Sequence, residues 1–262
     1  MIRENFHTHT NYCDGKCTAE EMIRAALNNN FTALGFSGHA HMDFDPSWCM
    51  TEEGTLAYIS EINSLKEKYK GKINIYCGTE VDYFCPELIG EYDYRIGSVH
   101  YLLENGEYLP VDGNIEEQKE AADKYYGGSL IEYAVHYFEL TADVVRKTKA
   151  DFIGHFDLVS KFNEGDRYFD THDPRYVKAW KEAAKCLCET NKPFEINTGA
   201  MARKLRTSPY PTLEMAEFIH DNGGEFIVNS DCHYPEKLTV GFNEAEELYS
   251  RFGIHSFEEY LR

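Results

Sequence analysis

The sequence has no apolar run long enough to cross a bilayer, and the residues after Met1 are polar instead of forming the apolar core of a signal peptide. None of its 8 cysteines forms a CxxC pair, so we expect reduced thiols rather than disulfides or a structural zinc site. It also contains no Pro/Ser-rich linker and no internal repeat. We therefore expect a cytoplasmic protein in which residues 1–262 form a single domain.

Positive charge is scarce, with 26 Lys and Arg residues against 45 Asp and Glu residues and a formal net charge of −19. An acidic surface repels a phosphate backbone, which argues against a general nucleic-acid binder. We expect no nucleic-acid partner and no membrane partner, and the oligomeric state stays open. The net charge does not decide the sign of a pocket that is filled with metal ions.

Short apolar or β-branched runs alternate with helical patterns along the whole chain, which is typical of βα units around a parallel sheet. We predict seven strands, at residues 5–9, 33–37, 73–79, 94–99, 152–155, 194–197 and 226–230. Helices outside such a sheet would close it into an α/β barrel with fewer strands than the familiar eight. In such barrels the active site lies at the C-terminal ends of the strands.

Start and stop signals place helices between these strands. Thr18 and Glu21 form a capping box for a helix through Leu27, and a second helix over 52–69 stops at Gly71. Other patterns predict helices over 115–149, with an interruption at Gly127 and Gly128, over 174–190, and from a first turn at Pro211 to Gly223 and Gly224.

Side chains that can bind metals follow nearly every predicted strand. His7 and His9 end the first strand as H-T-H, and the two-residue repeat of a strand points both imidazoles to one side. The other candidates are Asp14, His39, Glu80, His100, His155, Asp231 and His233. Isolated buried charges cost several kcal/mol unless they are paired or metal-bound. Six histidines and three carboxylates on one rim therefore predict a metal centre.

The ordered segments H-x-H, G-T-E, G-S-V-H, G-H-x-D and S-D-x-H resemble the PHP (polymerase and histidinol phosphatase) family from His7 to His233. The resemblance implies a distorted (β/α)7 barrel with a trinuclear metal site. Among family members, the chain length and the E-I-N-T segment look most like the stand-alone histidinol-phosphate phosphatases. The implied activity is a phosphomonoesterase that converts L-histidinol phosphate to L-histidinol and phosphate in histidine biosynthesis.

The resemblance also implies how the ligands divide among two or three divalent ions. A first ion would take His7, His9, Glu80 and Asp231; a second Asp14, His39 and His233; a third His100, His155 and the bridging Glu80. Mixed histidine and carboxylate ligands suit Zn, Fe or Mn, and leave the choice among them open. A hydroxide that bridges such ions would attack phosphorus in line.

Other residues are candidates for contact with the substrate, a small-molecule phosphate ester. Arg203 is the first candidate for a phosphate clamp, with a solvated surface charge as the alternative. The weaker candidates are Arg206, Lys161, Ser98 and Asn197. The alkoxide leaving group needs a metal or an acid, and His233 or Asp14 would supply the proton only where it is not fully engaged as a ligand.

Two positions depart from the family pattern, Gly38 where relatives often carry an acidic residue and His41 where many carry proline. His41 is either a substrate contact or an exposed loop residue. Asp157 would orient a ligand imidazole. For the pocket walls we consider Trp48, Tyr83 and Phe84, with core packing as the default, and Asp43 or Asp82 as partner of the substrate amine. The structural or surface histidines are His136, His172, His220 and His255.

Two alternatives remain beside histidinol phosphate. The enzyme could act on a nucleotide or a phosphoprotein, although the acidic charge weighs mildly against nucleic acid. The chain could also be a non-catalytic metal-binding protein, but loss of catalysis tends to leave gaps in a ligand set, and none of the nine positions is missing.

Overall fold

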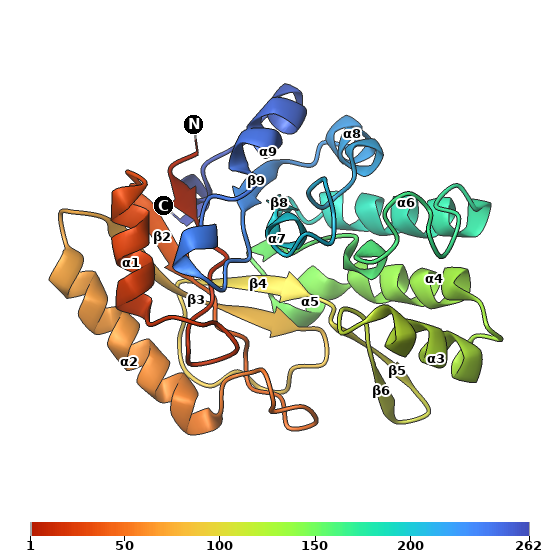
Figure 1. The fold of residues 1–262 in the computed structure, drawn as a ribbon, viewed down its shortest axis with the longest axis horizontal. Helices are drawn as coiled ribbons and strands as arrows, with labels where there is room; N and C mark the ends of the chain where they lie inside the picture. Colours follow the sequence, from red (N-terminus) through yellow and green to blue (C-terminus); the bar gives the residue numbers. More distant parts are fainter. Residues whose placement is uncertain (1, 262) are drawn as a thin grey trace.

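A sheet of seven parallel strands forms the centre of the molecule. The computed structural model describes residues 2–261, and Figure 1 shows the helices arranged around this sheet. The strand order is β1-β2-β3-β4-β7-β8-β9, with every neighbouring pair parallel. The strands are β1 (Glu4–Asn5), β2 (Ala33–Phe36), β3 (Asn74–Asp82), β4 (Tyr94–Ser98), β7 (Phe152–Ile153), β8 (Phe194–Asn197) and β9 (Phe226–Asn229).

The first and last strands meet just beyond their regular hydrogen-bonded parts. Thr8 and Cys232 form an isolated parallel bridge, in which His9 N donates to Cys232 O at 2.8 Å and Cys232 N donates to His7 O at 3.0 Å. The sheet is therefore nearly closed into a barrel, as the sequence predicts. The first strand is shorter than predicted, because residues 6–9 approach the last strand only at this bridge.

Nine α-helices are present in the described part of the chain. They are α1 (Ala19–Asn28), α2 (Glu52–Tyr69), α3 (Ile115–Tyr125), α4 (Leu130–Thr141), α5 (Val144–Thr148), α6 (Pro174–Cys188), α7 (Gly199–Ala202), α8 (Leu213–Asp221) and α9 (Phe242–Tyr249). Short 3-10 turns form η1 (Leu158–Ser160), η2 (Pro235–Lys237), η3 (Ser250–Phe252) and η4 (Phe257–Leu261). Among the described residues, no helix combines the length and the apolar character that crossing a membrane requires.

Several helices and strands of the structure differ in detail from those predicted from the sequence. The expected helix over 115–149 is three helices, and the first break falls at Gly127 and Gly128, whose φ angles are 60° and 82°. Pro211 precedes the helix instead of opening it, because Thr212 is the N-cap of α8 and accepts from Met215 N. The sequence analysis missed α7, α9 and an antiparallel hairpin of β5 (Tyr101–Glu104) and β6 (Glu107–Pro110).

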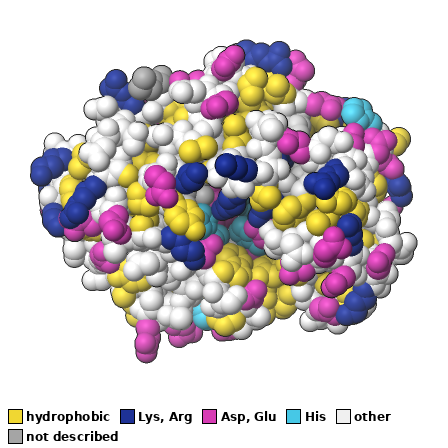
Figure 2. Space-filling view, viewed as in Figure 1, with side chains coloured by type: hydrophobic (Ala, Val, Ile, Leu, Met, Phe, Trp, Pro, Cys, Tyr) yellow, Lys and Arg dark blue, Asp and Glu magenta, His cyan; other side chains and the backbone are white. Residues whose placement is uncertain are grey.

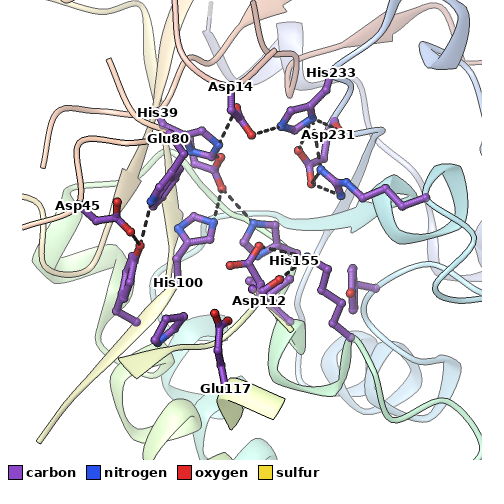
Figure 3. Close-up of a pocket in the computed structure, with 18 residues that line it drawn as sticks. Asp14, His39, Asp45, Glu80, His100, Asp112, Glu117, His155, Asp231 and His233 are labelled. Carbon is purple, nitrogen blue, oxygen red and sulfur yellow. Dashed lines mark hydrogen bonds and ion pairs between the residues drawn. The ribbon is translucent and has the colours of Figure 1, made fainter. Parts of the chain in front are cut away.

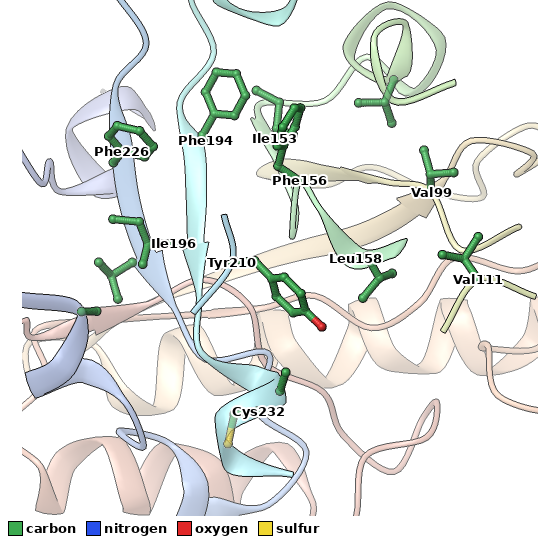
Figure 4. Close-up of a cluster of buried hydrophobic side chains, with 14 of the residues drawn as sticks. Val99, Val111, Ile153, Phe156, Leu158, Phe194, Ile196, Tyr210, Phe226 and Cys232 are labelled. Carbon is green, nitrogen blue, oxygen red and sulfur yellow. The ribbon is translucent and has the colours of Figure 1, made fainter. Parts of the chain in front are cut away.

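Aromatic side chains fill the N-terminal end of the barrel. The Tyr94 hydroxyl lies between strands and donates to the carbonyls of Phe6 at 2.6 Å and Phe36 at 3.0 Å. A Cβ at Gly78 would lie 2.2 Å from the Tyr94 ring, so only glycine leaves room for it. The main apolar cluster includes Phe194, Ile196 and Phe226 of β8 and β9 (Figure 4). With this end packed, the polar side chains gather at the opposite end.

Candidate metal centre and active-site cleft

A cleft opens at the C-terminal ends of the strands. Figure 2 shows a hollow on this face with histidine side chains inside it and lysine or arginine side chains along its edge. The cleft has a volume of about 280 Å³, and Figure 3 labels ten of the residues that line it. Seven of these ten are predicted metal ligands: Asp14, His39, Glu80, His100, His155, Asp231 and His233.

Glu80 lies at the centre of the ligand cluster, at the end of β3. Its Oε2 is 3.1 Å from His7 Nε2 and 3.0 Å from His39 Nδ1. Its Oε1 is 3.0 Å from His155 Nε2 and 3.3 Å from His100 Nε2. Burial would raise the pKa of Glu80, but the charges of the surrounding histidines hold that pKa well below its ordinary value. His9 Nε2 also lies 3.5 Å from Oε2, so the ionised carboxylate faces five imidazoles.

The H-T-H motif supplies two buried imidazoles beside this carboxylate. Burial, together with His233 and His39, lowers the pKa of His9 to about 3, so its ring is neutral. Neutral imidazole is the form that binds a metal. His9 stacks on His233, with 4.3 Å between ring centroids, so the first and last strands bring their histidines together.

Asp14 joins a second group with His39 and His233. Its Oδ2 is 3.0 Å from His233 Nε2, and its Oδ1 is 3.5 Å from His39 Nε2. Burial would raise the pKa of Asp14, but the hydrogen bond from His233 and the charge of His39 lower that pKa. The loop that follows the first strand thus adds an ionised carboxylate to the cluster.

The nine predicted ligands fall into four overlapping groups whose ligand atoms lie within 4.8 Å of one another. The groups are His9, Asp14, His39 and His233; His7, Glu80 and His155; His7, His9 and Asp231; and His39, Glu80 and His100. His9 Nε2 and Asp14 Oδ1 are buried and have no hydrogen-bond partner among the described residues. Imidazole nitrogens and carboxylate oxygens at this spacing fit divalent metal ions. A further group on an exposed loop, Asp166, Asp170 and His172, lies outside the cleft.

Asp231 has an unusual backbone conformation where it enters the cleft. Its φ of 47° is left-handed, a region in which aspartate is among the few tolerated non-glycine residues. Its Oδ2 accepts from Arg203 NH1 at 3.2 Å, and Arg203 NH2 lies 3.3 Å from His233 Nδ1. A Cβ at Gly199 would lie 2.8 Å from Asp231 Oδ2, so glycine allows this close approach. Arg203 lines the cleft beside the ligand cluster, as its predicted role requires.

The sequence analysis missed Glu195, which holds two ligands in place from β8. Its side chain is fully buried, and its Oε1 lies 2.7 Å from His7 Nδ1. Its Oε2 accepts from His155 N at 2.9 Å and from Asn197 Nδ2 at 2.8 Å. An acidic residue inside the otherwise apolar F-E-I-N strand was the available signal. A carboxylate on the far nitrogen of a ligand histidine fixes its tautomer and orientation.

Three of the predicted substrate contacts lie outside the cleft lining. Asn197 holds Glu195 as described, and Ser98 Oγ donates to Glu80 Oε1 at 2.6 Å. Arg206 NH1 donates to Asp157 Oδ2 at 3.1 Å, and the arginine lines a different cavity. Each of these side chains is turned toward a buried protein partner, and a direct contact with the substrate stays a prediction for all three.

Lys161 does line the cleft, but it is bound to an acidic neighbour. Its Nζ donates to the carbonyl of Asp112 at 2.7 Å and lies 3.2 Å from Asp112 Oδ2. Asp157, which was expected to orient a ligand imidazole, instead accepts from Arg206 and Ser160. The lysine therefore brings its positive charge to the cleft together with a carboxylate.

The outer wall of the cleft is aromatic and acidic. The Trp48 ring lies 4.4 Å from the His39 ring, and Trp48 Nε1 donates to the Tyr101 hydroxyl at 2.8 Å. Tyr101 in turn donates to Asp45 Oδ2 at 2.6 Å. Asp45, Asp112 and Glu117 line the cleft, whereas the sequence analysis had considered Asp43 and Asp82. Asp112 was missed because the hairpin that it follows was missed, whereas Asp45 lies in the loop after β2 and Glu117 lies on α3.

The remaining candidates contact other protein groups and do not line the cleft. Asp82 is buried and accepts from His100 N at 2.7 Å, while Asp43 pairs with His41 at 3.1 Å. His41 also bonds the carbonyl of Met50 at 2.9 Å and does not line the cleft. A Cβ at Gly38 would lie 3.0 Å from Met50 Sδ, so an acidic side chain there would displace Met50. The second-strand loop is thus closely packed where the sequence departs from the family pattern.

Comparison with known proteins gives a family for this geometry. The model of the PHP domain matches residues 5–199, which is well over half of the chain. The chain belongs to the PHP domain family. The resemblance seen in the ordered sequence segments is therefore confirmed.

The relatives of this PHP domain cover nearly its full length. It is 29% identical to the "probable histidinol-phosphatase" of Deinococcus radiodurans over 91% of this chain and 89% of the relative. The "probable histidinol-phosphatase" of Schizosaccharomyces pombe is 25% identical, over 95% and 87% of the two chains.

Two solved structures share the fold of this PHP domain. The HisK protein of Listeria monocytogenes superimposes with a TM-score of 0.80 at 21% identity, over 92% of this chain and 99% of that chain. The histidinol phosphate phosphatase of Lactococcus lactis, in complex with Zn, L-histidinol and phosphate, gives 0.72 at 20% identity, over 97% and 94%. These likenesses confirm the seven-stranded barrel class.

Proposed function

We propose that this chain is a metal-dependent phosphomonoesterase that hydrolyses L-histidinol phosphate to L-histidinol and phosphate. The observation that carries the proposal is the cluster of six histidines and three carboxylates around Glu80. The names of the two full-length relatives support the substrate, and the Lactococcus protein binds both L-histidinol and phosphate. Because β1 and β9 belong to one sheet, we also propose that residues 1–262 act as a single domain.

We propose two or three divalent ions, with zinc as the first candidate because the Lactococcus relative binds it. The ions would take the ligand sets that the family resemblance implies, with Glu80 shared between the first set and the third. When bound, such ions would neutralise phosphate oxygens and activate water as a nucleophile near neutral pH. The group of His9, Asp14, His39 and His233 contains the whole second set, and the group of His7, His9 and Asp231 contains three of the four ligands of the first set. Glu80 groups with His155 and with His100 separately, so the third set has less direct support.

The chain's own residues then bind and orient the ester. Arg203 offers two N–H donors beside Asp231. A planar guanidinium can donate two parallel hydrogen bonds to the oxygens of a phosphate. Asp45, Asp112 and Glu117 also line the cleft and would supply negative charge for an amine or imidazolium. Asp14 and His233 share a hydrogen bond of 3.0 Å, and this pair would supply the proton that the leaving alkoxide takes up only where the two side chains are not fully engaged as metal ligands.

The test is phosphate release from L-histidinol phosphate by purified protein, with elemental analysis of the same sample. A general ester, p-nitrophenyl phosphate, serves as comparison, and a nucleotide monophosphate and a phosphopeptide represent the alternative substrates. We expect kcat/KM for histidinol phosphate to exceed all three others, with activity that follows metal content.

Two results would contradict parts of the proposal separately. Metal-dependent cleavage of the general ester or the nucleotide alone would keep the chemistry and discard the substrate. A fully loaded protein that hydrolyses none of the four esters would discard catalysis and favour a metal-binding role.

A further inference from the structure

A second cavity lies apart from the cleft, between α6, the segment 160–171 and the start of α8. Its volume is about 250 Å³, and it shares no lining residue with the cleft. Pockets for drug-sized ligands hold about 300–1,000 Å³, so this cavity suits a small metabolite. Its polar lining includes Glu164, Asp166, Tyr176, Arg206 and Glu214.

Two buried polar groups that line this cavity have no partner. Tyr176 is 1% exposed and Arg206 is 7% exposed, yet the Tyr176 hydroxyl and Arg206 Nε have no hydrogen-bond partner among the described residues. Native proteins pair nearly all buried polar groups, so each exception calls for an explanation. Both groups carry a hydrogen to donate, so the partner that each lacks is an acceptor oxygen. Asp157 Oδ1 is a third buried atom without a partner, and it accepts no hydrogen bond from either donor.

The charges around the cavity limit what can carry that oxygen. The positive charge of Arg206 is already paired with Asp157, whose Oδ2 lies 3.1 Å from its NH1. Three further carboxylates line the cavity, from Glu164, Asp166 and Glu214. A simple anion would meet an excess of negative charge. A ligand that presents an acceptor to the buried end and a cation to the carboxylates meets both demands.

We propose that this cavity is a binding site for a small zwitterion of the α-amino acid class. The carboxylate of the ligand accepts from the Tyr176 hydroxyl and from Arg206 Nε. The ammonium lies toward Glu214 and Asp166, which are on the exposed side of the cavity. Nothing in this inference depends on the chemistry of the metal cleft.

The test is isothermal titration of the metal-loaded full chain with each proteinogenic L-amino acid. We expect at least one to bind with a Kd below about 1 mM. Tyr176→Phe removes only the hydroxyl, and Glu214→Gln removes only a surface charge, so each should weaken that binding by about tenfold or more. The matched control is Glu217→Gln, an exposed glutamate on the same helix that does not line the cavity and should leave the Kd unchanged.

Three results would overturn the proposal. The first is no binding by any amino acid at concentrations up to about 10 mM. The second is binding that both variants leave unchanged, which would place the ligand elsewhere. The third is binding that Tyr176→Phe weakens and Glu214→Gln does not, which would refute a zwitterion. Because Glu214 is exposed, its variant remains informative even where Tyr176→Phe disturbs folding.

Discussion

Replacement of Glu195 by glutamine tests how the metal ligands are held. The carboxylate accepts hydrogen bonds at both oxygens, from His7 on one side and from His155 N and Asn197 Nδ2 on the other. An amide of the same shape has only one acceptor oxygen. If its oxygen faces His155 and Asn197, its NH2 group meets His7 Nδ1 and forces the proton of His7 onto Nε2.

That proton would occupy the nitrogen that lies 3.1 Å from Glu80 and belongs to the ligand cluster. In the opposite orientation, two buried donors would face the NH2 group without an acceptor. Loss of such a supporting partner typically costs about 10–100-fold in metal affinity or activity. We therefore expect Glu195→Gln to weaken metal binding by about 1.4–2.8 kcal/mol, at 1.4 kcal/mol for each tenfold.

The assay is metal content by elemental analysis across a series of buffered free-zinc concentrations, with kcat for histidinol phosphate measured on the same samples. Circular dichroism reports whether the variant remains folded. The control is Glu189→Gln, an exposed glutamate in the connection that precedes β8. A folded Glu195→Gln protein with the zinc titration curve and kcat of the control would refute the assigned role of this carboxylate.

Three further predictions address other parts of the molecule. Glu80→Ala should abolish turnover and lower metal content while the fold persists, because one carboxylate faces five imidazoles. Near-normal kcat would defeat the bridging role, and His136→Ala, on α4 outside the cleft, is the control with unchanged activity. Arg203→Ala should raise KM for histidinol phosphate by about tenfold or more, because the hydrogen bonds from the guanidinium to the charged phosphate are lost. Steady-state kinetics that give an unchanged KM would exclude the phosphate clamp. Hydrogen bonds from Lys68 and Tyr69 lower the pKa of Glu20 to about 2. The stabilisation of the folded protein by this carboxylate is therefore present above about pH 4.5 and lost as the pH falls toward 2. The Tm difference between wild type and Glu20→Gln should shrink over that interval, and a constant difference would refute the ion pair.

The barrel class follows from local patterns that the sequence displays directly. Each predicted strand is a short, largely apolar run that ends in a polar residue or is followed directly by one. In the structure β3, β4, β8 and β9 end in a polar residue, and β2 ends at Phe36, directly before Ser37. The strand-end rule also predicts that residues as distant as Asp14 and His233 share one site, and they lie 3.0 Å apart. Such long-range contacts were predictable because parallel strands present their C-terminal ends at the same edge.

The missed features depend on contacts that no local pattern reveals. The β5–β6 hairpin has too little alternation to stand out, and with it Asp112 remained unassigned. The sequence ranked Arg203 ahead of Arg206 as a phosphate contact, but no local pattern showed that the first enters the cleft and the second is buried against Asp157. The backbone turns between them after α7, where Lys204 has a φ of 59°.

The closure of the barrel between Thr8 and Cys232 has a consequence for the order in which the protein is made. One ligand group joins His9 and Asp14 to His233, more than 200 residues further along the sequence. A ribosome must therefore synthesise the chain through His233 before the centre can assemble. A nascent or truncated chain that lacks the last strand carries most of the ligands, but it contains no complete form of that group.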